Sequence, residues 1–378
     1  MPVRTPSDAV PDIGATLDEL ETPALIVDLD VMEANIDRYT EIARRHDVRL
    51  RSHVKTHKVP AIAHHQVATT GGGIVCQKLS EVEVMAAAGL TDIYLSYQVV
   101  GDPKLRRLTK LVDGPASIAT TVDGPGNIAP LQAMAAAEDV MVPTVLEIDV
   151  GVGRTGVQPG EPAVELARRL RSETHLRFAG IMAYEAHVKS IADSEAAYER
   201  DCHEVMEVVA DTVDMMKDDD IEVPEVKVGG TATSPYSARH PVVDEINPGQ
   251  YAFNDVGEME ARPWAVDTDD CALTVLSTVI STQVDGQIVV DAGSKSLSMD
   301  TARMPVAVDR DDLRYAGYSE EHGHIDTSES DQSFSVGDRL SFIAPHVCPT
   351  INLHDTLVGV RDGVVTNVWD IQARGKVK

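Results

Sequence analysis

A lysine between two histidines is the first residue of this sequence with an evident chemical use. The segment RSHVKTHK, residues 51–58, places Lys55 at the end of a predicted strand over residues 48–54. A lysine at the end of a buried strand can form a Schiff base with a carbonyl compound. The positive charge of its neighbours favours the neutral, nucleophilic amine. For this segment taken alone, a solvated basic loop is the alternative.

A glycine-rich loop follows a later predicted strand. DVGVGRTGV, residues 149–157, contains Gly151-x-Gly153-x-x-Gly156, which nominally matches a dinucleotide-binding fingerprint. Arg154 lies within the same loop, and a flexible turn that lets an arginine reach inward explains the glycines equally well. Both interpretations remain open from the residues alone.

Two further segments could hold an anion. VGGTATSPY, residues 228–236, combines paired glycines, whose backbone N–H groups can approach a ligand, with the hydroxyls of Thr231 and Thr233. NPGQYAFND, residues 247–255, could present the Tyr251 hydroxyl to the same anion. A tight turn and an interdomain linker are the respective alternatives.

A histidine and a cysteine near the C-terminus could share a metal ion. His346 and Cys348 are separated by one residue, and on a strand such residues face the same side. Two protein ligands are too few for a closed structural zinc site, but they suit an open site completed by water or substrate. A buried cysteine beside a hydrogen-bonded histidine is the alternative.

The elements that would position these residues alternate between strand and helix as far as residue 230. Such alternation is typical of parallel βαβ units, and eight predicted strands suggest a closed (β/α)8 TIM-like barrel, with an open doubly wound sheet as the alternative. Functional residues of such barrels lie at the carboxyl ends of the strands. The predicted strands cover residues 24–30, 48–54, 73–78, 92–98, 116–122, 143–149, 177–183 and 225–230.

The pattern changes after Trp264. Asp285-Gly286 and Asp362-Gly363 each separate two β-rich runs, which is a strong hairpin signal. We therefore expect a barrel over residues 22–262 and an antiparallel β domain over residues 263–378. Residues 1–21 are expected to add a strand to that domain, and residues 319–335 to form a surface loop.

Composition limits the classes of partner. The chain has 378 residues with 33 Lys+Arg and 61 Asp+Glu, a formal charge of −28. This charge disfavours binding to nucleic acids and to anionic membranes. It also suggests a halophilic protein, because an acidic fold repels itself at low salt. Scattered cysteines, the absence of a signal core in MPVRTPSDAV and the lack of a long apolar run predict a cytoplasmic location.

Taken together, the segments resemble the fold type III pyridoxal phosphate (PLP) lyases, with an alanine racemase-like barrel. The similar subgroup contains D-threonine aldolase, 3-hydroxy-D-aspartate aldolase and D-serine dehydratase. The resemblance runs from about Thr22 to the C-terminus, and order and spacing match as a set. The motifs that carry it are TPALIVDLD, RSHVKTHK, CQKLSEVEVMAAAG, DVGVGRTGV, GGTATS, NPGQYAFND, DAGSKSLSMD, EEHG and HVCPTIN.

The resemblance implies a homodimer in which Lys55 binds PLP and His346 and Cys348 bind a divalent metal. Zinc is favoured by the thiolate, with manganese or magnesium as alternatives. It further implies contacts to the cofactor, including its phosphate, from Gln77, Arg154, Tyr184, Gly230, Thr231, Gly249 and Tyr251.

Two positions depart from the family's pattern. The aldolases usually carry His-Cys-Asp-Pro-Thr, with histidine and aspartate on the metal, whereas His346-x-Cys348 is similar to the zinc-dependent dehydratases. The aldolases also have a histidine base several residues beyond a strand-end tyrosine. Here His187 follows Tyr184 by only three residues, and we expect it to replace that base.

The expected function is a PLP- and metal-dependent lyase acting on a β-hydroxy D-amino acid. Retro-aldol cleavage of a D-threonine-type substrate to glycine and an aldehyde is the leading hypothesis. The alternative is a D-serine or 3-hydroxyaspartate dehydratase that releases a 2-oxo acid and ammonia. An amino-acid racemase, a non-catalytic PLP carrier and a dinucleotide-dependent oxidoreductase fit the residues less well.

Overall fold

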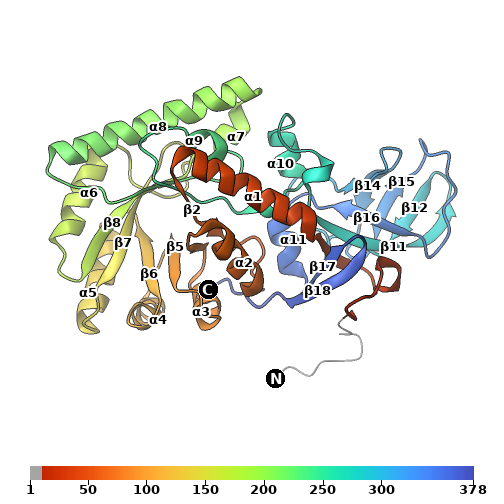
Figure 1. Ribbon diagram of the computed structural model, residues 1–378, viewed down its shortest axis with the longest axis horizontal. Coiled ribbons are helices and arrows are strands. Elements are labelled where there is room, and N and C mark those ends of the chain that lie inside the picture. Colours follow the sequence, from red (N-terminus) through yellow and green to blue (C-terminus); the bar gives the residue numbers. More distant parts are fainter. Residues whose placement is uncertain (1–10) are drawn as a thin grey trace. The chain divides into compact units, whose positions relative to one another are not determined.

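The computed structural model describes residues 11–378 and divides the chain into two compact units (Figure 1). The unit called here the barrel unit comprises residues 37–55, 60–249 and 375–378. The β unit comprises the residues up to 36, together with 56–59 and 250–374. This division does not coincide with a single boundary after residue 262, because the chain passes between the units several times. The segment MPVRTPSDAV, with its expected lack of a signal core, lies outside the described residues.

A parallel sheet forms the centre of the barrel unit, in the order β2-β10-β9-β8-β7-β6-β5-β4-β3. Most of its strands are buried on both faces, as is typical of a parallel sheet covered by helices. The strands are β2 (Arg49–Leu50), β3 (Ser52–His53), β4 (Ile74–Cys76), β5 (Asp92–Gln98), β6 (Ser117–Val122), β7 (Val142–Ile148), β8 (Leu176–Ala183), β9 (Val226–Val228) and β10 (Glu245–Ile246).

The sheet closes on itself through the segment that contains Arg51. β2 pairs with β10 while β3 pairs with β4, and a single residue separates β2 from β3. Arg51 N donates to Ile246 O at 3.0 Å, and Val54 N donates to Val75 O at 2.9 Å. One stretch of chain therefore contacts neighbours on both sides, which confirms the TIM-like barrel and excludes the open doubly wound sheet.

The helices between these strands are amphipathic or apolar and cover the barrel (Figure 1). Their starts follow ordinary capping chemistry: Ser194 Oγ accepts from Ala197 N at the start of α8, and prolines occupy the first turn of α4, α5 and α6. These helices are α2 (Pro60–Thr70), α3 (Leu79–Ala87), α4 (Asp102–Val112), α5 (Pro125–Ala137), α6 (Glu161–Ser172), α7 (Val188–Ile191), α8 (Glu195–Asp218) and α9 (Ser234–Ser237). The division between the units falls within α1 (Leu29–His46).

The predicted strand over residues 24–30 belongs to a different sheet. β1 (Ala24–Asp28) pairs antiparallel with β11 (Leu273–Val284) and parallel with β17 (Thr356–Arg361), all within the β unit. The prediction of a first barrel strand there is wrong, because a buried apolar run does not reveal which sheet it joins. Its place in the barrel is taken by β10, which has two residues and was not predicted.

The β unit contains the second sheet, in the order β14-β15-β12-β11-β1-β17-β18, with β16 pairing β11 and β13. Both predicted Asp-Gly hairpins are confirmed, as β11–β12 and β17–β18. The predicted loop over residues 319–335 is wrong in part, because it contains β15. The remaining elements are β12 (Gln287–Val290), β13 (Val306–Ala307), β14 (Arg314–Tyr318), β15 (Gly323–Asp326), β16 (Arg339–Ile343), β18 (Val364–Asp370), α10 (Val256–Ala261) and α11 (Val347–Leu353).

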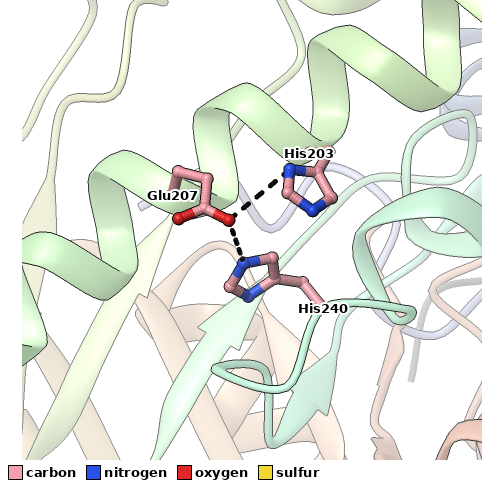
Figure 2. Close-up of side chains that lie close together, drawn as sticks. All are labelled: His203, Glu207 and His240. Atoms are coloured by element: carbon pink, nitrogen blue, oxygen red, sulfur yellow. Dashed lines mark hydrogen bonds and ion pairs between the residues drawn. The ribbon is translucent and has the colours of Figure 1, made fainter.

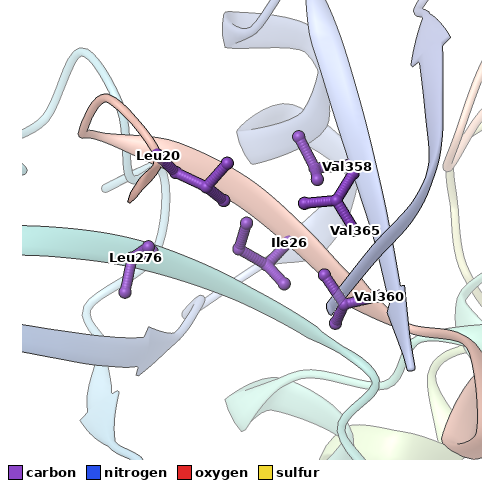
Figure 3. Packing of buried hydrophobic residues seen from close by; sticks show 6 residues of the cluster. All are labelled: Leu20, Ile26, Leu276, Val358, Val360 and Val365. Atoms are coloured by element: carbon purple, nitrogen blue, oxygen red, sulfur yellow. The ribbon is translucent and has the colours of Figure 1, made fainter. Parts of the chain in front are cut away.

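A cluster of aliphatic side chains packs on this sheet (Figure 3). It gathers residues from β1, β11, β17, β18 and the segment before β1, so the N-terminal segment is part of this core. Of the expected strand in residues 1–21, the described part shows one isolated bridge, between Thr16 and Val364. The cluster consists of Leu20, Ile26, Leu276, Val358, Val360 and Val365. Within residues 11–378, no helix combines the length and the apolar character that a membrane span requires.

A buried carboxylate lies beside the closing segment of the barrel. Glu245 is fully buried and accepts from Arg51 Nε at 2.9 Å and Lys227 Nζ at 3.2 Å. Burial alone would raise the pKa of Glu245, but the charges of Arg51 and Lys227 hold it below its ordinary value. The carboxylate is therefore ionised and pairs with two buried cations, whose remaining charge is balanced by Asp92 at Arg51 and by Glu225 at Lys227.

We predict that Glu245→Gln lowers the free energy of unfolding by about 3 kcal/mol, because it leaves buried cations without their main anion. Thermal or denaturant unfolding followed by circular dichroism measures the change. Glu41→Gln, which breaks an exposed pair with Arg44, is the matched control and should leave the transition midpoint unchanged. A Glu245→Gln protein as stable as the wild type would show that other groups balance the two cations.

Candidate functional site

The predicted site residues of the barrel unit all follow the carboxyl ends of barrel strands. The relevant strands are parallel neighbours, so these ends meet at one rim of the barrel. Arg154 lies in the loop after β7 and Gly249 lies three residues after β10. Lys55 follows β3, Gln77 follows β4, Tyr184 and His187 follow β8, and Gly230 and Thr231 follow β9.

The backbone at Lys55 is anchored by the strand that precedes it. Lys55 N donates to His53 Nδ1 at 3.4 Å, and His53 Nε2 lies 3.1 Å from Gln77 Oε1. Gln77 Nε2 in turn donates to Ser96 O at 3.0 Å, and Gln77 N donates to Glu81 Oε2 at 2.8 Å. Gln77 therefore lies close to the lysine segment, and a buried glutamate of α3 fixes its backbone.

Arg154 lies beside an aromatic ring and an acidic side chain. Its guanidinium carbon is 4.9 Å from the centre of the Tyr184 ring, and Nη2 is 3.8 Å from Glu147 Oε1. Glu147, in β7, also accepts from Thr155 Oγ1 at 2.8 Å. The sequence analysis did not single out Glu147, although an acidic residue inside the buried run PTVLEID was a usable signal.

His187 packs on the glycine-rich loop after β7. A Cβ atom at Gly151, which has φ +132°, would lie 2.9 Å from His187 Cε1 and Nε2, so only glycine leaves room for the ring. Gly156 packs equally closely on the backbone of Asp149. Packing therefore accounts for Gly151 and Gly156 without a dinucleotide, and Gly153 has φ +67°, a backbone conformation that favours glycine. Within residues 11–378, the buried His187 Nδ1 has no hydrogen-bond partner.

The loop after β9 is a closely packed turn rich in hydroxyls. Gly229 has φ +110°, and a Cβ atom there would lie 2.6 Å from Ser234 Oγ, while one at Gly230 would lie 3.0 Å from Tyr184 Cε2. Ser234 Oγ is buried and has no hydrogen-bond partner among residues 11–378. Paired glycines, neighbouring hydroxyls and an unpartnered buried oxygen fit the phosphate of a cofactor.

A buried glutamate, Glu185, accepts hydrogen bonds from this loop and from the helix α9 that follows it. Glu185 Oε2 accepts from Gly229 N at 3.1 Å and Glu185 Oε1 accepts from Ser237 Oγ at 2.7 Å. Burial raises the pKa of Glu185, although these hydrogen bonds oppose the shift. The sequence analysis missed Glu185, although its position directly after Tyr184 places it at the strand end.

The last two predicted phosphate contacts fall in different compact units. In the barrel unit, Gly249 N donates to Thr231 Oγ1 at 3.2 Å, so β9 and β10 are joined beyond their last residues. Tyr251 belongs to the β unit, in the short 3-10 helix Gln250–Ala252, and it is fully buried there.

The predicted metal pair lies at the start of a helix and not on a strand. His346 is the N-cap of α11, and Cys348 is the second residue of that helix. Asp255 Oδ2 accepts from Val347 N at 2.9 Å, and Thr350 Oγ1 donates to His346 O at 2.8 Å. The strand geometry expected for this pair is therefore wrong, because these bonds start a helix after β16.

His346 and Cys348 nevertheless interact, and Asp300 is their unpredicted neighbour. Asp300 Oδ2 lies 2.8 Å from His346 Nδ1, and Cys348 Sγ lies 3.3 Å from Thr56 Oγ1. Burial alone would lower the pKa of His346, but hydrogen bonding and charge from Cys348 and Asp300 raise it to about 9.

With Nδ1 of His346 engaged by the carboxylate, Nε2 is left for a metal, as in carboxylate–histidine–metal arrangements. One imidazole and one thiol are a donor set that fits a borderline-soft divalent ion such as zinc. Asp300 lies 46 residues from His346 in the chain, and nothing in the local sequence connects the two.

Comparison with known families gives two matches along the chain. Residues 27–255 match the family model described as "Alanine racemase, N-terminal domain". Residues 272–360 match the model described as "Putative serine dehydratase domain".

Full-length relatives and solved structures give the same result. D-threonine aldolase from Arthrobacter sp is 35% identical over 374 residues, covering 99% of this chain and 97% of the relative. The crystal structure of D-threonine aldolase from Filomicrobium marinum has 36% identity and a TM-score of 0.92, covering 98% of this chain and all of that one.

D-threo-3-hydroxyaspartate dehydratase from Delftia sp. HT23 has 28% identity and a TM-score of 0.85, covering 94% of this chain and 98% of that one. A variant of that dehydratase with a cysteine replaced by alanine is described as metal-free. The barrel, the antiparallel sheet and these matches over nearly the whole chain agree. The chain therefore belongs to the fold type III PLP-dependent family of D-threonine aldolase and D-serine dehydratase.

Proposed function

We propose that this protein is a PLP- and divalent-metal-dependent lyase that cleaves β-hydroxy D-amino acids of the D-threonine type into glycine and an aldehyde. The observation that carries the proposal is the position of Lys55 on the barrel rim that also carries the glycine and hydroxyl loop after β9. A cofactor with a carbonyl at one end and a phosphate at the other needs an amine and an anion-binding loop on one surface.

The residues of the barrel rim have distinct proposed roles. PLP, when bound, supplies an electron sink for negative charge at the substrate Cα. Lys55 binds its carbonyl carbon, and the loop over residues 229–233 receives its phosphate. The further proposed cofactor contacts are Gln77, Arg154, Tyr184, Gly230, Thr231, Gly249 and Tyr251.

The remaining residues act on the β-hydroxyl group of the substrate. His346 and Cys348 would hold a divalent cation, which lowers the pKa of a coordinated hydroxyl. Zinc suits this donor set better than manganese or magnesium, because one ligand is a thiolate. His187 would accept the hydroxyl proton, the Cα–Cβ bond would break with its electron pair left at Cα and the aldehyde released, and return of a proton to Cα would give glycine.

Dehydration is the second candidate, and Cys348 is the residue that favours it. A Cys-to-Ala variant of the similar dehydratase is described as metal-free, which suggests that a cysteine matters for its metal. In that reaction the Cα proton leaves and the β-hydroxyl departs as water. The same residues would then assist a leaving group instead of a proton transfer.

The products formed from D-threonine separate the two candidates. We expect PLP-loaded protein with zinc, in concentrated KCl, to give glycine and acetaldehyde, identified by chromatography and mass spectrometry. Formation of 2-oxobutanoate and ammonia would show a dehydratase. If β-hydroxy D-amino acids give neither pair of products, the proposed lyase function is wrong.

Two lysine variants control this assay. Lys55→Ala should lose the visible absorbance of lysine-bound PLP and lower turnover by about a thousandfold or more, because no other amine takes its place. Lys110→Ala, which changes an exposed lysine of α4, should retain both. Full turnover by Lys55→Ala would end the assignment of Lys55.

Asp300 provides a test of the metal pair. We predict that Asp300→Ala weakens zinc binding by about 10- to 100-fold, because His346 loses the carboxylate that orients its ring. Competition with a chelating dye measures the affinity. Asp285→Asn is the matched control, since Asn-Gly suits the same hairpin turn as Asp-Gly. Unchanged affinity in Asp300→Ala would mean that the carboxylate does not orient a metal ligand.

We further propose that the enzyme is a cytoplasmic homodimer adapted to high salt. The family resemblance supports the dimer, and the formal charge of −28 supports the salt dependence. The melting temperature should rise steeply with KCl, because ions screen the repulsion between acidic side chains. A melting temperature indifferent to KCl would contradict the salt adaptation, and a monomer in light scattering would contradict the dimer.

A further inference from the structure

A second group of metal-binding side chains lies on the outer helix α8, apart from the residues of the proposed reaction. His203 and Glu207 are four residues apart, so they share one face of the helix. His240, from the segment between α9 and β10, points toward the same place (Figure 2). One nitrogen from each histidine and one carboxylate oxygen of Glu207 all lie within 4.8 Å of one another.

Two of the three distances already match a tetrahedral zinc site. Zinc lies about 2.0 to 2.2 Å from nitrogen and carboxylate ligands, so two ligand atoms of one tetrahedron are about 3.3 to 3.6 Å apart. Glu207 Oε1 lies 3.6 Å from His203 Nδ1 and 3.3 Å from His240 Nε2. Only the two ring nitrogens must approach each other, and the side chain of His203 is 62% exposed and can rotate.

The charges around the cluster permit a cation. Arg239 is next to His240 in the chain, but its Nη1 lies 2.7 Å from Glu199 Oε1 and its guanidinium lies over the Tyr236 ring. Arg200, three residues before His203 in α8, has its Nη2 2.6 Å from Asp201 Oδ1. Both positive charges are therefore largely balanced, and Glu207 adds a negative charge between the two rings.

Two existing contacts oppose metal binding: one hydrogen bond of His240, and the edge-to-face contact between the His203 and His240 rings, whose centres lie 5.2 Å apart. Val242 N donates to His240 Nδ1 at 3.2 Å, and this bond is lost if the ring proton moves to Nδ1 when Nε2 binds a metal. One neutral hydrogen bond and one ring contact are a small loss compared with coordination by three ligands.

We infer that His203, Glu207 and His240 form a zinc-type divalent metal site with an open fourth position for water. The site lies within the barrel unit and does not depend on the proposed lyase function. An ion there would fasten α8 to the segment between α9 and β10, and it would stabilise the folded barrel unit because it binds no comparable site in the unfolded chain.

The test counts zinc ions per chain in paired proteins. Wild type and His203→Gln are loaded with Zn²⁺, passed through a desalting column and assayed for metal. We expect His203→Gln to retain one equivalent less than wild type, and Glu207→Gln to behave in the same way. Because the result is a difference of one equivalent, it holds whether or not His346 and Cys348 bind metal.

Zinc titration with melting curves gives the second readout. Wild type should melt at a higher temperature in Zn²⁺, whereas His203→Gln should show a smaller shift or need at least about tenfold more zinc to reach it, since any zinc at His346 and Cys348 stabilises both proteins alike. Glu204→Gln, which removes a neighbouring exposed charge of α8, and His65→Gln, an exposed histidine of α2, are the matched controls.

Three outcomes would overturn the inference. One is equal zinc content in wild type, His203→Gln and Glu207→Gln. Another is an equal loss in Glu204→Gln, which would show general attraction to an acidic helix. The third is a zinc-dependent melting shift that persists unchanged in both cluster variants, which would place the stabilising ion elsewhere.

Discussion

The buried ion cluster around Glu245 is the constraint on which the barrel and its rim depend. The closing strands β2, β3 and β10 have two residues each, so few backbone hydrogen bonds fix their register. A slip by one residue would turn every side chain of the segment to the opposite face. We infer that the pairing of Glu245 with Arg51 and Lys227 penalises such a slip, because it would separate buried charges. Lys55 lies four residues after Arg51, in the turn that follows β3.

Carboxylates also fix the segments that carry the proposed site residues. Several of the segments that carry proposed site residues are held by a carboxylate that accepts from a backbone N–H, a hydroxyl or a ring nitrogen. Loops have no ladder of hydrogen bonds to fix them, and a carboxylate can accept from several donors at once. The carboxylates are Glu81 for Gln77, Glu147 for Thr155, Glu185 for Gly229, Asp255 for Val347 and Asp300 for His346.

Local patterns predicted the elements better than their partners. The run over residues 92–98 coincides with β5, and both Asp-Gly hairpins were found, because alternation and turn chemistry are local properties. β1 was placed in the wrong sheet and β10 was missed, because sheet membership depends on contacts far away in the chain. The side chains of His346 and Cys348 lie close together at the start of a helix, and the sequence did not show that a helix begins there. One of the hydrogen bonds at the start of α11 comes from Asp255, about ninety residues earlier in the chain.

The acidic composition shows why the rest of the site could not be predicted. The net charge of −28 counts every carboxylate equally, so it does not distinguish one carboxylate from another. It bears on solubility and on the exclusion of anionic partners. The carboxylates that position the site are a small and different group: Glu185, Glu245 and Asp255 are fully buried, and each neutralises or orients other groups. Only the fold separates them from the exposed majority, since burial and partners arise from tertiary contacts. His203 and Glu207 make the same point, because their helical spacing is visible in the sequence, whereas His240 reaches them only through the fold.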